Sequence, residues 1–335
     1  MDPFTQGALG AALPQACCRQ AAKVRIAGAM GFLAGMAADL DVLIRSSADP
    51  LLFLEYHRQF THSLVFVPVG GFLAALALHF VAGRRWQLPF RTSALVCTLG
   101  YATHAVLDAM TSYGTRLLWP FSDERFAWKI ISIIDPLFTL PLAALVALSA
   151  LRRKPFLARL ALLWAGLYLA LGALQHQAAL NMGRELAASR GHMPVRMEVK
   201  PSFGNTLVWK VLYQADGRYH VDAVRAGLRP RVYPGTSVPR FDAARDLPWL
   251  KPGTQQARDL DRFRQFSDGF LALDQNHPNR VIDVRYSLFP NEIDALWSIE
   301  LSETVGPADH VRFLTHRRNA RRRLGDLWNM IAGTE

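Results

Sequence analysis

Cysteine is scarce in this sequence. Only Cys17, Cys18 and Cys97 occur among 335 residues. Adjacent cysteines rarely bridge each other, three cysteines cannot form a closed disulfide framework, and their spacing matches no zinc-binding motif. We therefore expect free thiols, and a fold that disulfides do not hold together.

Charge is scarce too, and unevenly distributed. Hydrophobic residues make up 51% of the chain and charged residues 19%, which is apolar for a soluble protein. The charges are sparse in residues 1–180, whereas residues 184–335 have the composition of a soluble domain. The N-terminus has no basic segment before its first apolar stretch, which argues against a cleaved signal peptide.

Long apolar runs fill the first half. Each is close to the roughly 20 residues that cross the hydrocarbon core of a bilayer, and Gly28, Gly31 and Gly35 in the first of them suit close helix packing. A shorter run at 4–16 is a half-helix or a tilted first span. The predicted spans are 24–44, 64–82, 93–112, 130–150 and 156–175.

The predicted fold is thus an α-helical polytopic membrane bundle of five to six helices over residues 1–180. A C-terminal soluble domain, mixed α/β or mostly β, follows at 195–335. Strands are expected at 197–199, 206–214, 219–224, 281–288 and 294–301, with Asp216-Gly217 as a hairpin turn. Prolines, including Pro234 and Pro239, are expected in loops.

The net charge of +11 is placed mainly between the apolar runs. Basic residues occupy 83–92, 151–155 and the stretch from Arg19 to Arg25, which favours the positive-inside rule over nucleic-acid binding. These loops are predicted to be cytoplasmic. Residues 45–63, 113–129 and everything after 176 then lie on the outer side, so we expect a multi-pass membrane protein with its C-terminal domain on that side. The basic segment 312–331 suits either an amphipathic helix on anionic lipid or a solvated helix face.

Ionisable residues inside spans are costly and are therefore functional candidates. His104 and Asp108 lie four residues apart and share one helix face. Asp39 and Asp41 lie near the outer end of 24–44, and the segment from His57 to Ser63 precedes 64–82 on the same side. The predicted topology brings all of these groups to similar depth.

Imidazole and carboxylate groups are suitable ligands for a divalent metal, zinc in particular. Asp39 and Asp41 are only two residues apart, so they fit best where the helix ends and unwinds. Asp135 before Pro136 is either a further member or a helix cap. Arg58 is expected to pair with a substrate or a carboxylate, and His79 and His176 are expected to pack. The predicted metal ligands are Asp39, Asp41, His57, His62, His104 and Asp108.

Five segments together resemble a known family: Met1–Gly10, Gly35–Asp41, His57–Ser63, His104–Gly114 and Ile134–Leu137. They are similar to the YdjM-like, LexA-regulated group of bacterial inner-membrane metal-dependent hydrolases. The resemblance implies a site at the six predicted ligands, and it implies that the membrane is the bacterial inner membrane, so that the outer-side C-terminal domain is expected in the periplasm. Two positions depart from the family pattern, since Ala38 stands where proline is usual and Gln6 where histidine is common.

The expected activity is hydrolysis by metal-activated water at the outer face of the membrane. Asp39, Asp41, Asp108 and Arg58 are the catalytic candidates, and an ester or phosphodiester, in lipid or in a small molecule, is the expected substrate. Membrane lipids are the expected partners. A scaffold or stress protein with a structural metal remains an alternative. A transporter of protons or metal ions is disfavoured because the polar groups gather in one half of the membrane.

Overall fold

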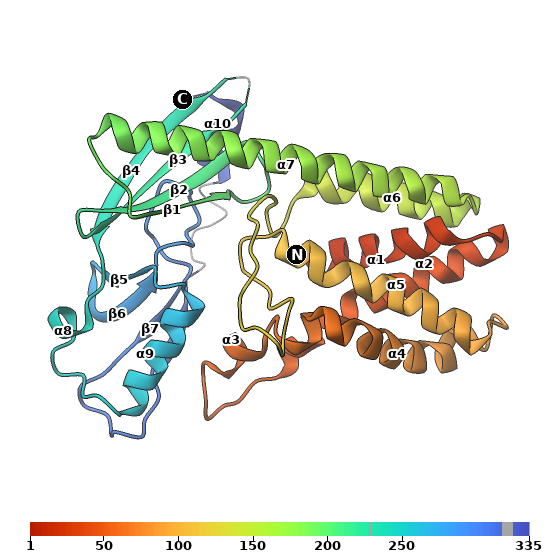
Figure 1. Ribbon diagram of the computed structural model, residues 1–335, viewed down its shortest axis with the longest axis horizontal. Coiled ribbons are helices and arrows are strands. Elements are labelled where there is room, and N and C mark those ends of the chain that lie inside the picture. Colours follow the sequence, from red (N-terminus) through yellow and green to blue (C-terminus); the bar gives the residue numbers. More distant parts are fainter. Residues whose placement is uncertain (228, 317–323, 335) are drawn as a thin grey trace. The chain divides into compact units, whose positions relative to one another are not determined.

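The computed structural model describes residues 1–227, 229–316 and 324–334 (Figure 1). Contacts divide the chain into two compact units. The helical unit comprises Met1–Leu43, Tyr56–Leu174 and Phe203–Asn205. The sheet unit comprises Ile44–Glu55, Gln175–Ser202 and Thr206–Glu335. Segment 44–55 therefore groups with residues far along the chain rather than with its sequence neighbours.

The helical unit is built from α1, α2, α4, α5, α6 and the first part of α7, whereas nearly all of α3 belongs to the sheet unit. Two of its helices begin with an aspartate cap followed by proline: Asp2 accepts from the Thr5 amide before α1, and Asp135 from the Phe138 amide before α6. Such caps satisfy amides that the helix itself leaves free. The helices are α1 Pro3–Cys17, α2 Val24–Met36, α3 Leu52–Tyr56, α4 Val67–Leu78, α5 Phe90–Ala109, α6 Pro136–Arg152 and α7 Pro155–Ser189.

Within the described residues, three helical stretches are long and apolar enough to cross a membrane: Ala21–Leu43, Leu64–Gly83 and Pro155–Ser189. They confirm the apolar runs predicted at 24–44, 64–82 and 156–175. The last is much longer than predicted, because α7 is 35 residues long and its part from Gln175 onward belongs to the sheet unit. The other two runs are helical with shifted ends. The first, α5, carries His104 and Asp108, which reduce its hydropathy, and α6 begins only at Pro136 and is 17 residues long.

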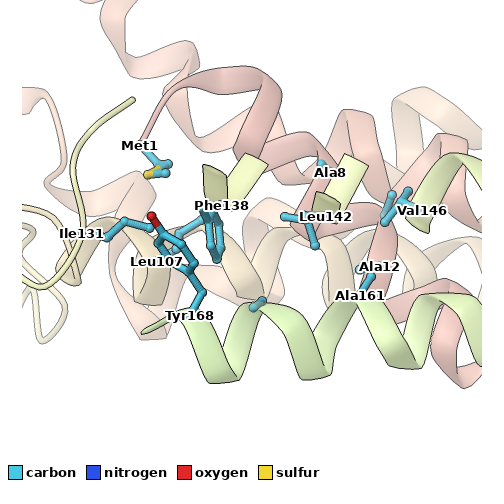
Figure 2. Packing of buried hydrophobic residues seen from close by; sticks show 12 residues of the cluster. Met1, Ala8, Ala12, Leu107, Ile131, Phe138, Leu142, Val146, Ala161 and Tyr168 are labelled. Atoms are coloured by element: carbon cyan, nitrogen blue, oxygen red, sulfur yellow. The ribbon is translucent and has the colours of Figure 1, made fainter. Parts of the chain in front are cut away.

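Apolar side chains of α1, α6 and α7 form the core on one side of the helical unit. Figure 2 shows Phe138 and Leu142 of α6 between Ala8 and Ala12 of α1 and Tyr168 of α7. The rings of Phe138 and Tyr168 have centroids 5.6 Å apart. This packing holds α1 beside the helices that follow it by more than a hundred residues.

Glycines bring α1, α2 and α5 together at backbone distance. A Cβ atom on Gly100 of α5 would lie 2.5 Å from the Gly31 carbonyl oxygen, and one on Gly10 of α1 would lie 2.7 Å from the same atom. Small residues permit this approach between membrane helices. The predicted role of Gly31 and Gly35 in close packing is confirmed, since a Cβ on Gly35 would lie 2.8 Å from the Gln6 carbonyl oxygen.

Substituting Gly100→Ala is expected to lower the thermal unfolding temperature of the detergent-solubilised protein. The added methyl group meets backbone atoms that cannot rotate away, and overpacking of this kind costs about 1–3 kcal/mol. Gly166→Ala in α7 is the matched control, because a Cβ there meets nothing within 4 Å. Equal unfolding temperatures for the two variants would contradict the close contact.

The sheet unit contains two antiparallel sheets, in strand orders β1-β2-β3-β4 and β5-β6-β7-β8. Leu212 and Val221 of the first sheet pack with Ile282 of the second, while Ala179 and Ala187 of α7 pack against the other face of the first (Figure 1). The strands are β1 Arg196–Pro201, β2 Val208–Ala215, β3 Arg218–Arg225, β4 Arg231–Pro239, β5 Leu271–Asp274, β6 His277–Asp283, β7 Trp297–Glu300 and β8 Arg312–Thr315. The helices are α8 Ala243–Asp246, α9 Gln255–Phe266 and α10 Leu324–Ala332.

The turns and prolines of this half match the sequence predictions only in part. Asp216 and Gly217 form the expected hairpin turn, with φ angles of 49° and 72°. The loop positions predicted for Pro201, Pro234 and Pro239 are wrong, because Pro201 is the last residue of β1 and the other two lie in β4. Among the described strands β4 pairs only with β3, and an edge strand tolerates residues without an amide hydrogen. The segment predicted at 312–331 contains β8 and α10, while its arginines at 317, 318 and 321–323 lie outside the described residues.

Candidate metal centre

The first two aspartates lie where an α-helix tightens. The α-helix α2 ends at Met36, and the chain continues as the 3₁₀-helix η2, Ala37–Leu43. A 3₁₀-helix has three residues per turn, so residues two apart are rotated by roughly 240° about the axis and their directions differ by roughly 120°. Asp39 and Asp41 consequently reach different partners, which agrees with the expectation that the regular helix ends there.

Four side chains from three segments converge on one point. Nε2 of His62, in the 3₁₀-helix η3 Phe60–His62, lies 3.5 Å from Asp39 Oδ1 and 3.2 Å from Asp108 Oδ2. In the same way, Nε2 of His104 in α5 lies 3.4 Å from Asp39 Oδ1 and 3.5 Å from Asp108 Oδ2. These four atoms all lie within 4.8 Å of one another.

Three of the four atoms are buried without a hydrogen bond. They are Nε2 of His62, Nε2 of His104 and Oδ2 of Asp108, and all three side chains have an exposed fraction of 0%. Buried polar atoms nearly always have a partner, so a group of unsatisfied ones calls for an explanation. Asp39 is different, since 17% of its side chain is exposed.

The outward nitrogen of each imidazole is held in place. His104 Nδ1 lies 2.6 Å from the Gly35 carbonyl oxygen, so it must donate there. His62 Nδ1 lies 2.9 Å from Thr61 Oγ1 and 3.3 Å from Asp41 Oδ2. A proton on Nδ1 leaves the Nε2 lone pair free to face the cluster. Histidines that bind metals usually have their other ring nitrogen bonded in this way.

Asp108 is held through one oxygen and presents the other. The amide of Gln6 donates to Oδ1 at 2.8 Å, and the Met1 amino group also contacts Oδ1. Nε of Arg58 lies 3.0 Å from Oδ2, within ion-pair distance. Arg58 is itself buried; it donates to Thr111 Oγ1 at 3.0 Å, and its guanidinium lies over the Tyr113 ring. Arg58 therefore contacts a carboxylate, one of the two roles expected for it.

Asp41 and His57 bond to each other beside the four-atom cluster, and Asp41 also contacts His62. Asp41 Oδ1 lies 2.8 Å from His57 Nδ1, while Oδ2 accepts from the Arg58 amide and from Thr61 Oγ1, both at 2.9 Å. Both carboxylate oxygens therefore have partners already. Asp39, Asp41 and His57 do form a second group with metal-ligand spacing, but in that group two of the three side chains bond to each other.

Negative charge exceeds positive charge in the cluster. The carboxylates of Asp39, Asp41 and Asp108 outnumber the guanidinium of Arg58 and the amino group of Met1. Burial disfavours a charged imidazole at His62, but the neighbouring carboxylates of Asp108, Asp39 and Asp41 outweigh it and raise the pKa of His62 to about 10. The surroundings thus favour a positive charge at the centre of the cluster.

Other candidates lie elsewhere. Asp135 caps α6 and accepts from the Tyr168 hydroxyl at 2.9 Å, which fits its interpretation as a helix cap. His79 Nδ1 lies 3.0 Å from Ser93 Oγ, and His176 Nε2 lies 3.2 Å from the Val199 carbonyl oxygen, so both fit the packing role expected of them. The sequence alone gave Gln6 and Thr61 no function in the site. The only signal for them was their place inside the segments that resemble the family.

A known protein family matches the part of the chain that carries this cluster. A family model described as YdjM inner membrane protein matches residues 1–179, which is more than half of the 335 residues. The inner membrane protein YbcI of Escherichia coli (strain K12) is 37% identical over 111 residues, which cover 31% of this chain and 60% of that protein. The matched segment thus spans less than two thirds of that relative. No solved structure matches the chain.

Proposed function

The chain belongs to the YdjM inner membrane protein family, and from this premise we propose that its helical unit binds one divalent metal ion and hydrolyses a substrate with it. One observation carries the proposal. Two imidazole nitrogens and one carboxylate oxygen are buried, lack hydrogen bonds and converge on the same point as Asp39.

Zinc fits the spacing of these atoms. Zinc bonds to nitrogen and oxygen of about 2.0–2.2 Å imply roughly 3.3–3.6 Å between neighbouring ligand atoms of a tetrahedron. The four nitrogen–oxygen distances between the histidines and aspartates run from 3.2 to 3.5 Å. His62, His104 and Asp108 would hold the ion. Asp41 and His57, whose polar atoms bond to each other, would orient His62 and the Arg58 backbone.

Hydrolysis is proposed because Asp39 differs from the other three. A bound zinc ion lowers the pKa of its water to about 7 and so supplies hydroxide at neutral pH. Asp39 alone among the four has exposed surface, so it borders the side that solvent and substrate can enter. From there its carboxylate is placed to accept a proton, while Arg58 keeps Asp108 charged.

An ester or phosphodiester with an apolar chain is the proposed substrate. Leu40 and Leu43, on either side of Asp41 in η2, are 63% and 75% exposed. Exposed leucines beside a polar cluster at the end of a membrane helix suit contact with lipid. We further propose that this end of the helices faces the periplasm and that residues after 176 lie there, because the basic loops belong on the cytoplasmic side.

A structural metal is the second candidate, and a specific observation favours it. Two histidines and two aspartates already supply four ligand atoms, and closed four-ligand sites are typical of structural zinc. In the hydrolase, Asp39 acts as a base beside an open position. In the structural protein, Asp39 is the fourth ligand.

Asp39→Asn separates the two. The purified protein in detergent is assayed for zinc content and for hydrolysis of generic esters and phosphodiesters, with and without a chelator. The hydrolase predicts chelator-sensitive turnover in the wild type, and zinc retention with loss of turnover in Asp39→Asn. Zinc without turnover in the wild type would favour the structural candidate. Wild type that takes up no zinc when supplied with it would refute both.

A further inference from the structure

The two halves of the metal centre are joined by a segment of the other unit. Asp41 and His57 lie 16 positions apart in the chain, and most of what separates them, Ile44–Glu55, belongs to the sheet unit. The conformations open to this segment therefore limit where the two ends can lie.

An arginine of α9 holds the segment. Arg262 donates to both carboxylate oxygens of Asp49, at 2.8 and 3.0 Å, and its Nε donates to Glu55. It also contacts Asp259 on its own helix at 2.9 Å. Asp259 is in turn fixed by His310 at 2.8 Å. Bidentate arginine–carboxylate pairs fix geometry as well as charge, so Asp49 and Glu55 are tied to one point.

Apolar contacts support the same arrangement. Leu51 is fully buried and Leu54 is 5% exposed. The ring of Phe53 lies edge-on to that of Phe313 in β8, with centroids 5.2 Å apart. Segment 44–55 is thus packed into the sheet unit, with Arg262 at the point where its charged residues meet.

We propose that Arg262 is a positioning residue for the metal centre. The inference rests on the proposed metal site. Asp49 follows Asp41 by eight positions, and Glu55 precedes His57 by two. Fixing both acids shortens the free chain next to Asp41 and His57, and a shorter free chain loses less entropy when the centre is ordered around an ion. The sheet unit thereby promotes metal binding in the helical unit.

The coupling must also act in reverse, because linkage between two binding or ordering events is reciprocal. Metal bound at the centre should stabilise segment 44–55 on α9. This gives a readout that does not depend on catalysis: amide hydrogen exchange of 44–58 and of α9, with and without zinc.

The test uses full-length protein in detergent with zinc alone as the probe. Arg262→Ala is expected to weaken zinc affinity roughly tenfold, the lower end for outer-shell changes. It should also speed exchange in 44–58 and abolish the zinc-dependent protection of α9. Arg262→Lys, which keeps the charge, should restore part of the affinity. Arg264→Ala is the matched control, since that arginine lies on the same helix and pairs with the exposed Asp261.

The outcomes are distinguishable. Zinc affinity unchanged in Arg262→Ala, beside a wild type that binds zinc, would overturn this inference and leave the proposed function intact. A wild type that binds no zinc would remove both. If exchange in β1–β3 shows that Arg262→Ala unfolds the sheet unit, Glu55→Gln replaces it, because it removes the negative charge that pairs with Arg262 and leaves α9 unchanged. Unchanged affinity and exchange in that variant would equally count against the proposal.

Discussion

His104→Ala is expected to lower zinc affinity by at least about 100-fold, since outer-shell substitutions alone cost 10- to 100-fold. The substitution removes Nε2, which lies 3.4 and 3.5 Å from the two aspartate oxygens of the cluster. The cluster then offers three ligand atoms, from Asp39, His62 and Asp108, and it keeps the negative charge of its two aspartates. The affinity is measured by competition with a chromophoric chelator in detergent.

His79→Ala is the control for this experiment. His79 is also a histidine of the helical unit, but its Nδ1 bonds to Ser93 rather than to a carboxylate. We expect zinc affinity equal to that of the wild type. Tight stoichiometric zinc in a correctly folded His104→Ala protein would show that the four-atom cluster is not the metal site.

Arg58→Ala is expected to destabilise the metal-free protein by about 3–5 kcal/mol, the usual result of removing one partner of a buried charge pair. Asp108 is completely buried, and Arg58 is the only side-chain cation of fixed charge beside its Oδ2 in the described chain. Zinc should restore much of this loss, because an ion at the cluster replaces the missing positive charge. At 100 times its dissociation constant a ligand stabilises by about 2.7 kcal/mol. The measurement is thermal unfolding of each protein with and without zinc.

Arg116→Ala provides the comparison. Arg116 pairs with Asp123 at 3.1 Å, but 83% of the Asp123 side chain is exposed. Surface pairs contribute about 0–1 kcal/mol, so this variant should unfold close to the wild-type temperature and gain no more from zinc than the wild type does. If Arg58→Ala behaves like Arg116→Ala, Arg58 does not supply the charge that Asp108 requires.

The composition of the cluster could be predicted because its geometry is local. His104 and Asp108 share a face in any α-helix, and Asp39 and Asp41 needed only the end of a helix to reach a common depth. The separation of roles could not be predicted. Asp41 bonds to His57 and Thr61 while Asp39 faces the two imidazoles, whereas the sequence indicated only that the regular helix would end near them.

Hydropathy predicted those helices that apolar length alone defines. It located Ala21–Leu43 and Leu64–Gly83, because apolar length alone makes a candidate membrane span. It was less accurate for α5, because that helix is polar where it carries the site. The sequence also failed to predict β4, because its prolines favour loops and are tolerated only at the edge position that β4 has among the described strands. Gln6 reaches Asp108 across 102 positions, a contact that depends on glycine packing between helices and that no local pattern encodes.

The packing of segment 44–55 on α9 has a consequence for the order of synthesis. Glu55 and Arg262 are 207 positions apart. Ribosomes add roughly 5–20 residues per second, so the segment waits roughly 10–40 s for its partner. All residues of the candidate metal centre are made by position 108, long before the α9 arginine that holds Asp49 and Glu55. Any effect of Arg262 on the proposed metal site can therefore begin only after most of the chain has been translated.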